Sequence, residues 1–259
     1  MRRPAVRFAS LALGLGLLLP TRVAAQDLRI AAASDLQAVF TVLASRFEQE
    51  TRHPAGLTFG SSGHFFSQIQ NGAPFDLFFS ADIDYAARLE AGGLAEPGSL
   101  YRYALGRIVV WSRRDSGIDV RRGLAVLSDA RVRRVAIANP EHAPYGRAAV
   151  AALRSANLYE KVRPKFVFGE SISQAAQFIQ SGNAEAGIIA FSLALAPALR
   201  DDGVYYEIPA SLHPPIEQAV VVTRASGRKD VARQFIAFLK RPESIGLMRE
   251  FGFTGPVSP

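Results

Sequence analysis

The 259-residue sequence contains no cysteine, so it offers no disulfide, no thiol nucleophile and no Cys-ligated metal site. Its four histidines, His53, His64, His142 and His213, show none of the spacings typical of metal ligands. No phosphate-binding P-loop and no dinucleotide-binding glycine motif occurs. From these absences we expect no cofactor and no metal ion ligated directly by the protein.

Long hydrophobic runs are also missing, apart from one short run near the N-terminus. Arg2, Arg3 and Arg7 precede an apolar stretch at 11–19, and Val23-Ala24-Ala25 follows it as a small-residue cleavage signal. This order is typical of a secretory signal peptide, and the apolar stretch is too short to span a bilayer. We therefore predict that residues 1–25 are removed on export, by the Sec rather than the twin-arginine route, and that the protein is periplasmic. An uncleaved anchor is the alternative.

The positive charge of the chain is partly a property of this leader. Four of the 30 basic residues and none of the 23 acidic ones lie in residues 1–25, so the net charge falls from +7 to +3 without them. A balance this close to neutral does not favour nucleic acid as a partner. The cluster of Arg131, Arg133 and Arg134 is expected to be a solvated face.

Strand-like and helix-like segments alternate through the rest of the chain, which predicts an α/β fold with largely parallel sheets. A strand at 28–33 and a helix at 36–50 begin the series. The long apolar strand at 104–112 is a candidate for the crossing into a second domain. The strand at 219–223 and the helix at 230–240 have no further unit to join, so we expect them to return to the first domain.

These segments predict two α/β lobes with a ligand-binding cleft between them. The first lobe takes residues 26–105 and 216–259, and the second takes residues 106–215. Two crossings of the chain between lobes would permit hinge closure around a ligand.

Small polar turns open several of the predicted helices. They are Ala31-Ala32-Ala33-Ser34-Asp35-Leu36, Phe59-Gly60-Ser61-Ser62-Gly63, Asn139-Pro140-Glu141-His142-Ala143-Pro144-Tyr145-Gly146 and Gly169-Glu170-Ser171-Ile172-Ser173. The N-terminus of a helix carries unpaired N–H groups and partial positive charge, so it binds anions without a basic side chain. Turns that converge on one point would make an anion receptor.

Each candidate in these turns also has a structural alternative. Ser34 is placed to cap a helix, and Tyr145 to pack half-buried, although its phenol can donate to an oxyanion. Ser62 lies beside glycines that permit a nest of N–H donors, and the alternative is an ordinary serine-rich turn. We expect the Asp35 side chain to turn away while its N–H faces the cleft. A catalytic pair of Ser62 and His64 is disfavoured, because the G-x-S-x-G spacing is missing and adjacent side chains diverge.

Four motifs in this order resemble the periplasmic molybdate-binding proteins, the substrate-binding subunits of ABC-type molybdate importers. The motifs are 31–36, 59–63, Asn71-Gly72-Ala73-Pro74-Phe75-Asp76-Leu77-Phe78-Phe79-Ser80-Ala81-Asp82 and 140–146, and the similarity runs from about Asp27 to the C-terminus. The resemblance implies a bilobal periplasmic-binding-protein fold of type II. It also implies a tetrahedral oxyanion held by neutral donors, no enzymatic activity, and a membrane permease as partner.

Carried over by position, the resemblance assigns the oxyanion ligands. Ser34 and Ser62 match the two hydroxyl ligands of the first lobe, Tyr145 matches a ligand in the Pro-x-Gly turn, and Ile172 matches a backbone N–H donor. Some members draw their tyrosine from the position of Ala190 instead, so this chain resembles the branch with tyrosine in the turn. Asp35 falls where some relatives donate from an uncharged side chain, so it is assigned less firmly than Ser34.

The implied function is capture of molybdate, and of tungstate as well, by a monomer that delivers it to an ABC-type permease in the inner membrane. Hydroxyl and N–H donors suit a dianion, since hydrogen bonds to an ionised acceptor contribute roughly 1.5–3 kcal/mol each. A receptor for sulfate, phosphate or another tetrahedral oxyanion is the alternative, and Asp35 is the one candidate acceptor for a protonated phosphate. A secreted serine hydrolase and the sensing domain of a regulator are more remote alternatives.

Overall fold

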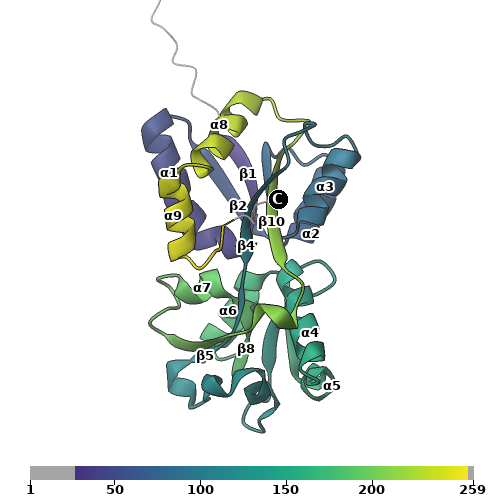
Figure 1. Ribbon diagram of the computed structural model, residues 1–259, viewed down its shortest axis with the longest axis vertical. Coiled ribbons are helices and arrows are strands. Elements are labelled where there is room, and N and C mark those ends of the chain that lie inside the picture. The colour runs from purple at the N-terminus through teal and green to yellow at the C-terminus, as the bar shows by residue number, and fades with distance from the viewer. Residues whose placement is uncertain (1–26, 256–259) are drawn as a thin grey trace, which may run out of the picture.

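The computed structural model describes residues 27–255. This part of the chain forms two five-stranded sheets and the helices that cover them. The sheets have the orders β2-β1-β3-β10-β4 and β7-β6-β8-β5-β9, and each forms one lobe of the elongated molecule in Figure 1. We name them the first lobe and the second lobe. The predicted signal peptide at 1–25 lies outside the described residues.

The first lobe is built from both ends of the chain. Its elements are β1 (Leu28–Ala33), the short 3-10 helix η1 (Ser34–Leu36), α1 (Gln37–Thr51), β2 (Ala55–Gly60), α2 (Ser62–Gln70), β3 (Leu77–Ser80), α3 (Ile83–Ala91), β4 (Tyr101–Gly106), β10 (Ile216–Val222), α8 (Lys229–Leu239) and α9 (Pro242–Glu250).

The second lobe is one continuous stretch of chain. Its elements are β5 (Ile108–Arg113), η2 (Arg114–Ser116), η3 (Val120–Ser128), β6 (Val135–Ala138), α4 (Pro144–Ser155), α5 (Tyr159–Val162), η4 (Arg163–Lys165), β7 (Phe166–Gly169), α6 (Ile172–Gln180), β8 (Ala186–Ala190), α7 (Phe191–Leu195), β9 (Gly203–Glu207) and η5 (Ala210–Leu212). Within the described residues, no helix of either lobe has the length and apolarity needed to span a bilayer.

Both sheets are mixed: in each, four strands run in one direction, in line with the expectation of largely parallel sheets, and one strand runs against them. In the first lobe β1 runs parallel to β2 and β3, whereas β10 runs antiparallel to β3 and β4. In the second lobe β6 runs parallel to β7 and β8, whereas β5 runs antiparallel to β8 and β9. The strand that runs against the others is, in each sheet, the one that follows a crossing between lobes: β5 follows β4, and β10 follows β9 and η5.

The segment at 104–112 crosses from the first lobe to the second as predicted, but the expectation of one long strand was wrong. It is two strands that belong to different sheets, β4 and β5, with Arg107 between them. Gly106 pairs with Ile216 in the first lobe, and Ile108 pairs with Ala190 in the second. Apolar residues stand on both sides of Arg107 because both strands are buried, so hydrophobicity alone does not show that they belong to two sheets.

The two lobes have cores of different composition. In the first lobe, α1, α8 and α9 cover one face of the sheet and α2 and α3 cover the other (Figure 1). The first of these faces holds a cluster of aromatic rings, with Phe235 in edge contact with Phe40, Phe47 and Phe79. The core of the second lobe is aliphatic apart from a few rings, of which Trp111 is fully buried.

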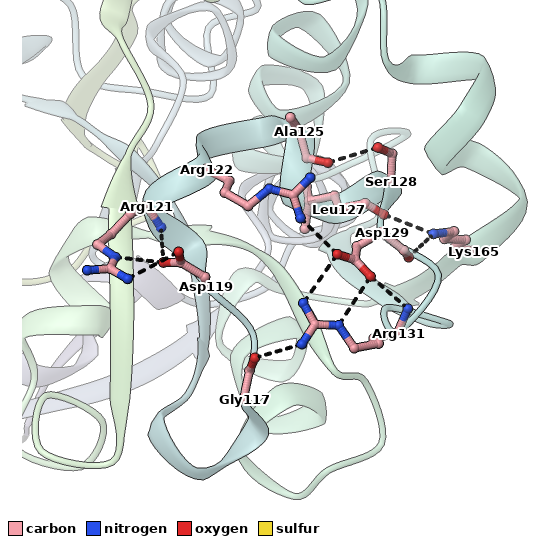
Figure 2. A network of polar contacts seen from close by, with 10 residues as sticks. All are labelled: Gly117, Asp119, Arg121, Arg122, Ala125, Leu127, Ser128, Asp129, Arg131 and Lys165. Atoms are coloured by element: carbon pink, nitrogen blue, oxygen red, sulfur yellow. Dashed lines mark hydrogen bonds and ion pairs between the residues drawn. The ribbon is translucent and has the colours of Figure 1, made fainter.

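A network of ion pairs covers the second lobe at 117–131, and Figure 2 shows it. The carboxylate of Asp129 accepts hydrogen bonds from Arg131 and Arg122, and these contacts hold its pKa well below the usual range. Arg133 and Arg134 pair in turn with Glu185. Each arginine of the cluster noted in the sequence therefore has a carboxylate partner, and their side chains are exposed, as expected of a solvated face.

Candidate functional site

The candidate ligands lie where parallel strands of both sheets end. Ser34 follows β1 directly, Ser62 is the first residue of α2 after β2, and Tyr145 lies in the first turn of α4 after β6. Ile172 is the first residue of α6 after β7. The carboxyl ends of neighbouring parallel strands meet at one edge of a sheet, and helix N-termini gather there with their free N–H groups. The two edges face each other across the boundary between the lobes.

Ser34 and Ser62 are buried, and both hydroxyls accept a hydrogen bond from backbone N–H groups outside their own turn. The Ser34 hydroxyl accepts from the N–H of Ser173 on α6, at 3.2 Å, and so reaches into the second lobe. The Ser62 hydroxyl accepts from the N–H of Ala81, at 2.9 Å. Neither side chain caps its helix. Since each oxygen accepts, its hydrogen is left to donate to a ligand.

Tyr145 and Asp35 meet across the lobe boundary. The Tyr145 hydroxyl donates to Asp35 Oδ2 at 2.8 Å, and the Gln218 side-chain amide donates to the same oxygen at 2.6 Å and to the phenol at 2.9 Å. Tyr103 completes the network by donating to the amide oxygen of Gln218 at 2.7 Å. The other carboxylate oxygen, Oδ1, is buried and accepts no hydrogen bond from the residues that the structure describes.

The expectation that the Asp35 side chain turns away was therefore wrong, because its carboxylate lies at the centre of this network. Sequence reasoning also missed Gln218 and Tyr103. The signal that would have found Gln218 is a lone amide inside the apolar run of β10, where it is fully buried. A buried amide needs partners for both its donor and its acceptor, so it marks a polar site within a core.

Burial sets the protonation of the network. Loss of water raises the pKa of Asp35 from its ordinary value of 3.8 to about 6, against the opposing effect of the hydrogen bonds from Gln218 and Tyr145. Burial, with the charge of Asp35 beside it, also raises the pKa of Tyr145 well above 10. The phenol is therefore neutral at physiological pH, whereas the carboxyl group is mostly ionised there, with its pKa only a little below neutral pH.

These protonation states decide where the phenol hydrogen goes. While Asp35 is ionised it can only accept, so it holds the hydrogen of Tyr145. Once protonated, Asp35 can donate to the phenol oxygen, and the phenol is then able to donate to an oxyanion. Gly106 leaves the space that the phenol occupies, because a Cβ at that position would collide with the Tyr145 hydroxyl.

Further contacts join the lobes at the rim of the site. The N–H of Gly63 donates to the carbonyl of His142 at 3.0 Å, and the Ser61 hydroxyl donates to the same carbonyl at 2.7 Å. On another side Arg147 of α4 pairs with Asp82, the N-cap residue of α3. A groove of about 460 Å³, lined by residues of both lobes, opens beside that ion pair. The structure thus shows the two lobes in contact around the candidate ligands.

The geometry does not support a hydrolase. The recorded partner of the Ser62 hydroxyl is a backbone N–H, and the His64 ring stacks on His142 instead of facing Ser62. A Ser–His contact does form, between Ser61 Oγ and His142 Nδ1 at 3.0 Å. Because the Ser61 hydrogen is held by the His142 carbonyl, Nδ1 must be the donor in that contact, and it cannot act as a base toward the hydroxyl.

Comparison with known protein families gives a match over nearly the whole described chain. Residues 28–254 match the model of a family described as bacterial extracellular solute-binding protein. The sequence is 36% identical over 244 residues to the molybdate-binding protein ModA of Rhodobacter capsulatus, with 94% of each chain covered. It is 37% identical over 242 residues to ModA of Azotobacter vinelandii, with 93% of this chain and 95% of that protein covered.

Comparison with solved structures agrees. The fold matches the periplasmic molybdate-binding protein of Azotobacter vinelandii with a TM-score of 0.84 and 33% identity, and the match covers 89% of this chain and all of that one. The chain therefore has the bilobal type II fold that its motifs predicted, and its relatives are binding proteins for transport rather than enzymes.

Proposed function

This chain belongs to the family of bacterial extracellular solute-binding proteins, and from that membership we propose that it captures molybdate and delivers it to an ABC-type importer. The observation that carries the proposal is the meeting of donors from both lobes. The Ser34 hydroxyl reaches the N-terminus of α6, and the Tyr145 phenol reaches Asp35. Hydroxyl and N–H donors that converge in a buried site suit a small dianion, which needs donors and no counter-charge.

The proposed ligand set is Ser34, Ser62, the phenol of Tyr145 and the backbone N–H of Ile172. Asp35 enters as the group that controls the phenol. We propose that oxyanion binding is coupled to protonation of Asp35, because an ionised carboxylate would repel a dianion and retain the Tyr145 hydrogen. Molybdenum is then held through the oxygens of its oxyanion, with no bond from the protein to the metal.

The remaining parts of the proposal concern the setting. The chain is exported by its signal peptide, acts in the periplasm as a monomer, and divides into lobes at 26–105 with 216–259 and at 106–215. Tungstate is proposed as a second ligand, because it has the same shape and charge as molybdate. The partner is an ABC-type molybdate permease in the inner membrane.

Calorimetric titration of the mature chain with molybdate, tungstate, sulfate and phosphate tests the function. We expect tight one-to-one binding of molybdate and tungstate. At a ligand concentration of 100 times Kd, thermal or urea unfolding should show about 2.7 kcal/mol of added stability. Stabilisation by sulfate or phosphate but not by molybdate would overturn the proposal.

One observation favours a second candidate, a receptor for an oxyanion that carries a proton. The buried Asp35 Oδ1 accepts no hydrogen bond from the described residues, so it could accept one from hydrogen phosphate. The same titration separates the two. A phosphate receptor would lose its preferred ligand in Asp35→Asn, whereas a molybdate receptor would keep its own.

A further inference from the structure

His64, His142 and Glu170 form a cluster at the rim of the site that the proposed function does not use. His64 lies on α2 of the first lobe, and His142 and Glu170 lie in turns of the second lobe. One ligand atom of each residue lies within 4.8 Å of the others. The residues are far apart in the sequence, so their spacing could not indicate a metal site.

We propose that this cluster is a binding site for a divalent transition metal ion of the zinc class, and that the ion bridges the two lobes. The donor set is two imidazoles and one carboxylate. That set suits zinc and its neighbours, whereas calcium and magnesium prefer oxygen ligands alone. The inference is independent of the oxyanion that the cleft binds.

The distances are close to those a metal requires. Glu170 Oε2 lies 3.3 Å from Nε2 of His142 and 3.8 Å from Nε2 of His64. In a tetrahedral site with metal–nitrogen bonds of 2.0–2.1 Å, neighbouring ligand atoms are roughly 3.4 Å apart. The His64 ring stacks on His142 with an interplanar angle of 24°, so it must turn out of the stack to point its lone pair at a shared ion. The side chains of His64 and Glu170 are 48% and 66% exposed, which leaves both room for that rotation.

The tautomer of His142 is also the one a metal needs. Its Nδ1 carries the hydrogen and donates to Ser61 Oγ, because the Ser61 hydrogen is already held by the His142 carbonyl. In the neutral ring, Nε2 therefore keeps its lone pair, and this is the atom that faces Glu170. A ligating histidine whose other nitrogen donates to a fixed acceptor is the usual arrangement in metal sites.

The cluster lies between the two lobes, so an ion bound there would affect their closure. Gly63 packs directly on the backbone of His142, where a Cβ would collide, so the two histidines are brought together only when the lobes meet. An ion held by ligands from both lobes would favour the closed arrangement. The size of the effect is set by how much more tightly the ion binds the closed arrangement than the open one. Three protein ligands leave a fourth position for water.

The test is calorimetric titration of the oxyanion-free mature chain with zinc chloride alone. We expect one zinc site per chain in the wild type, with affinity at least tenfold weaker in His64→Ala and in Glu170→Gln. These two residues come from different lobes, so a loss in both variants demonstrates the bridge. The matched control is His53→Ala, which removes a histidine away from the cluster and should leave zinc binding unchanged.

Zinc binding in His64→Ala equal to that of the wild type would overturn the proposal, as would no zinc binding in the wild type. Circular dichroism of each variant excludes misfolding as the cause of a loss. Because molybdate is absent throughout, failure of this test and failure of the proposed oxyanion function are separate results.

Discussion

The two lobes share one sheet topology but fill it with different side chains. The core of the first lobe is rich in aromatic rings in edge contact, including Phe40, Phe79 and Phe235. The core of the second is dominated by valine, isoleucine, leucine and alanine around Trp111. Helix N-termini nevertheless meet at the same strand ends in both. The site thus depends on the topology, and many core compositions can support it.

The lobes also differ in what they bring to the site. The first supplies the serine hydroxyls and the acid Asp35, and the second supplies the phenol of Tyr145 and the N-terminus of α6. The acid and the phenol come into contact only where the lobes meet. Each prediction below tests one side of this comparison, from the largest expected effect to the smallest.

The contrast between the cores is tested by Phe235→Ala. Phe235 touches Phe40, Phe47, Phe79 and Phe238, so its removal should cost about 3–5 kcal/mol of the stability of the first lobe. The chain has one tryptophan, Trp111, buried in the second lobe, so its fluorescence reports that lobe alone. In urea we expect the circular dichroism transition to shift while the fluorescence midpoint stays. A joint shift of both signals would show that the lobes unfold as one unit.

The cost of the buried acid is tested by Asp35→Asn. Since the pKa rises from 3.8 to about 6 on folding, the folded state holds the proton more tightly, and stability is lost as the pH rises through this range. Above pH 6 the ionised form should cost about 3 kcal/mol relative to low pH. Asp35→Asn removes this loss, so its advantage over the wild type should grow between pH 4 and 6.5 in urea unfolding. A difference that does not change with pH would contradict the assignment.

The role of the phenol is tested by Tyr145→Phe. Loss of the hydroxyl should weaken molybdate binding by about 1–3 kcal/mol, because one hydrogen bond to an ionised acceptor is lost. Tyr205→Phe, at an exposed tyrosine of β9, is the control and should bind as the wild type does. Unchanged affinity in Tyr145→Phe by calorimetry would mean that the phenol only packs.

The coupling of acid and phenol is tested by the pH dependence of binding. If molybdate binds the form with Asp35 protonated, its affinity should fall by about tenfold per pH unit above the pKa near 6. In Asp35→Asn the affinity should be almost flat between pH 6.5 and 8. Titrations in buffers of different ionisation enthalpy should show uptake of one proton in the wild type and none in the variant. Equal pH profiles would break the coupling.

Much of the fold could be predicted from local patterns. The strand at 28–33 and the helix after β1 followed from apolar periodicity, and so did the alternation that gives an α/β fold. The crossing between lobes at 104–112 was predicted, but its division into β4 and β5 was not, because apolar residues flank Arg107 on both sides and only long-range pairing separates the two strands. Helix α9, at Pro242–Glu250, also went unpredicted; it packs with α1 and α8 over the same face of the first sheet.

The candidate site divides in the same way. Its serines and its tyrosine lie in turns with a recognisable composition, so sequence reasoning could name them. Gln218 and the protonation of Asp35 depend on partners 183 and 110 residues away along the chain. No local pattern encodes such contacts, because burial and hydrogen bonding at that range are properties of the assembled lobes.

The interruption of the first lobe by the second has a consequence for the order of folding. Strand β10 lies between β3 and β4 in the sheet, but it follows β4 only after the whole second lobe has been made. The first sheet therefore lacks an inner strand until residue 216 is available, whereas the second lobe holds all its strands in one continuous stretch. Contacts that are closer in sequence form faster. The first lobe is thus the last to be completed, and the second lobe, which is inserted in its sequence, can already be folded by then.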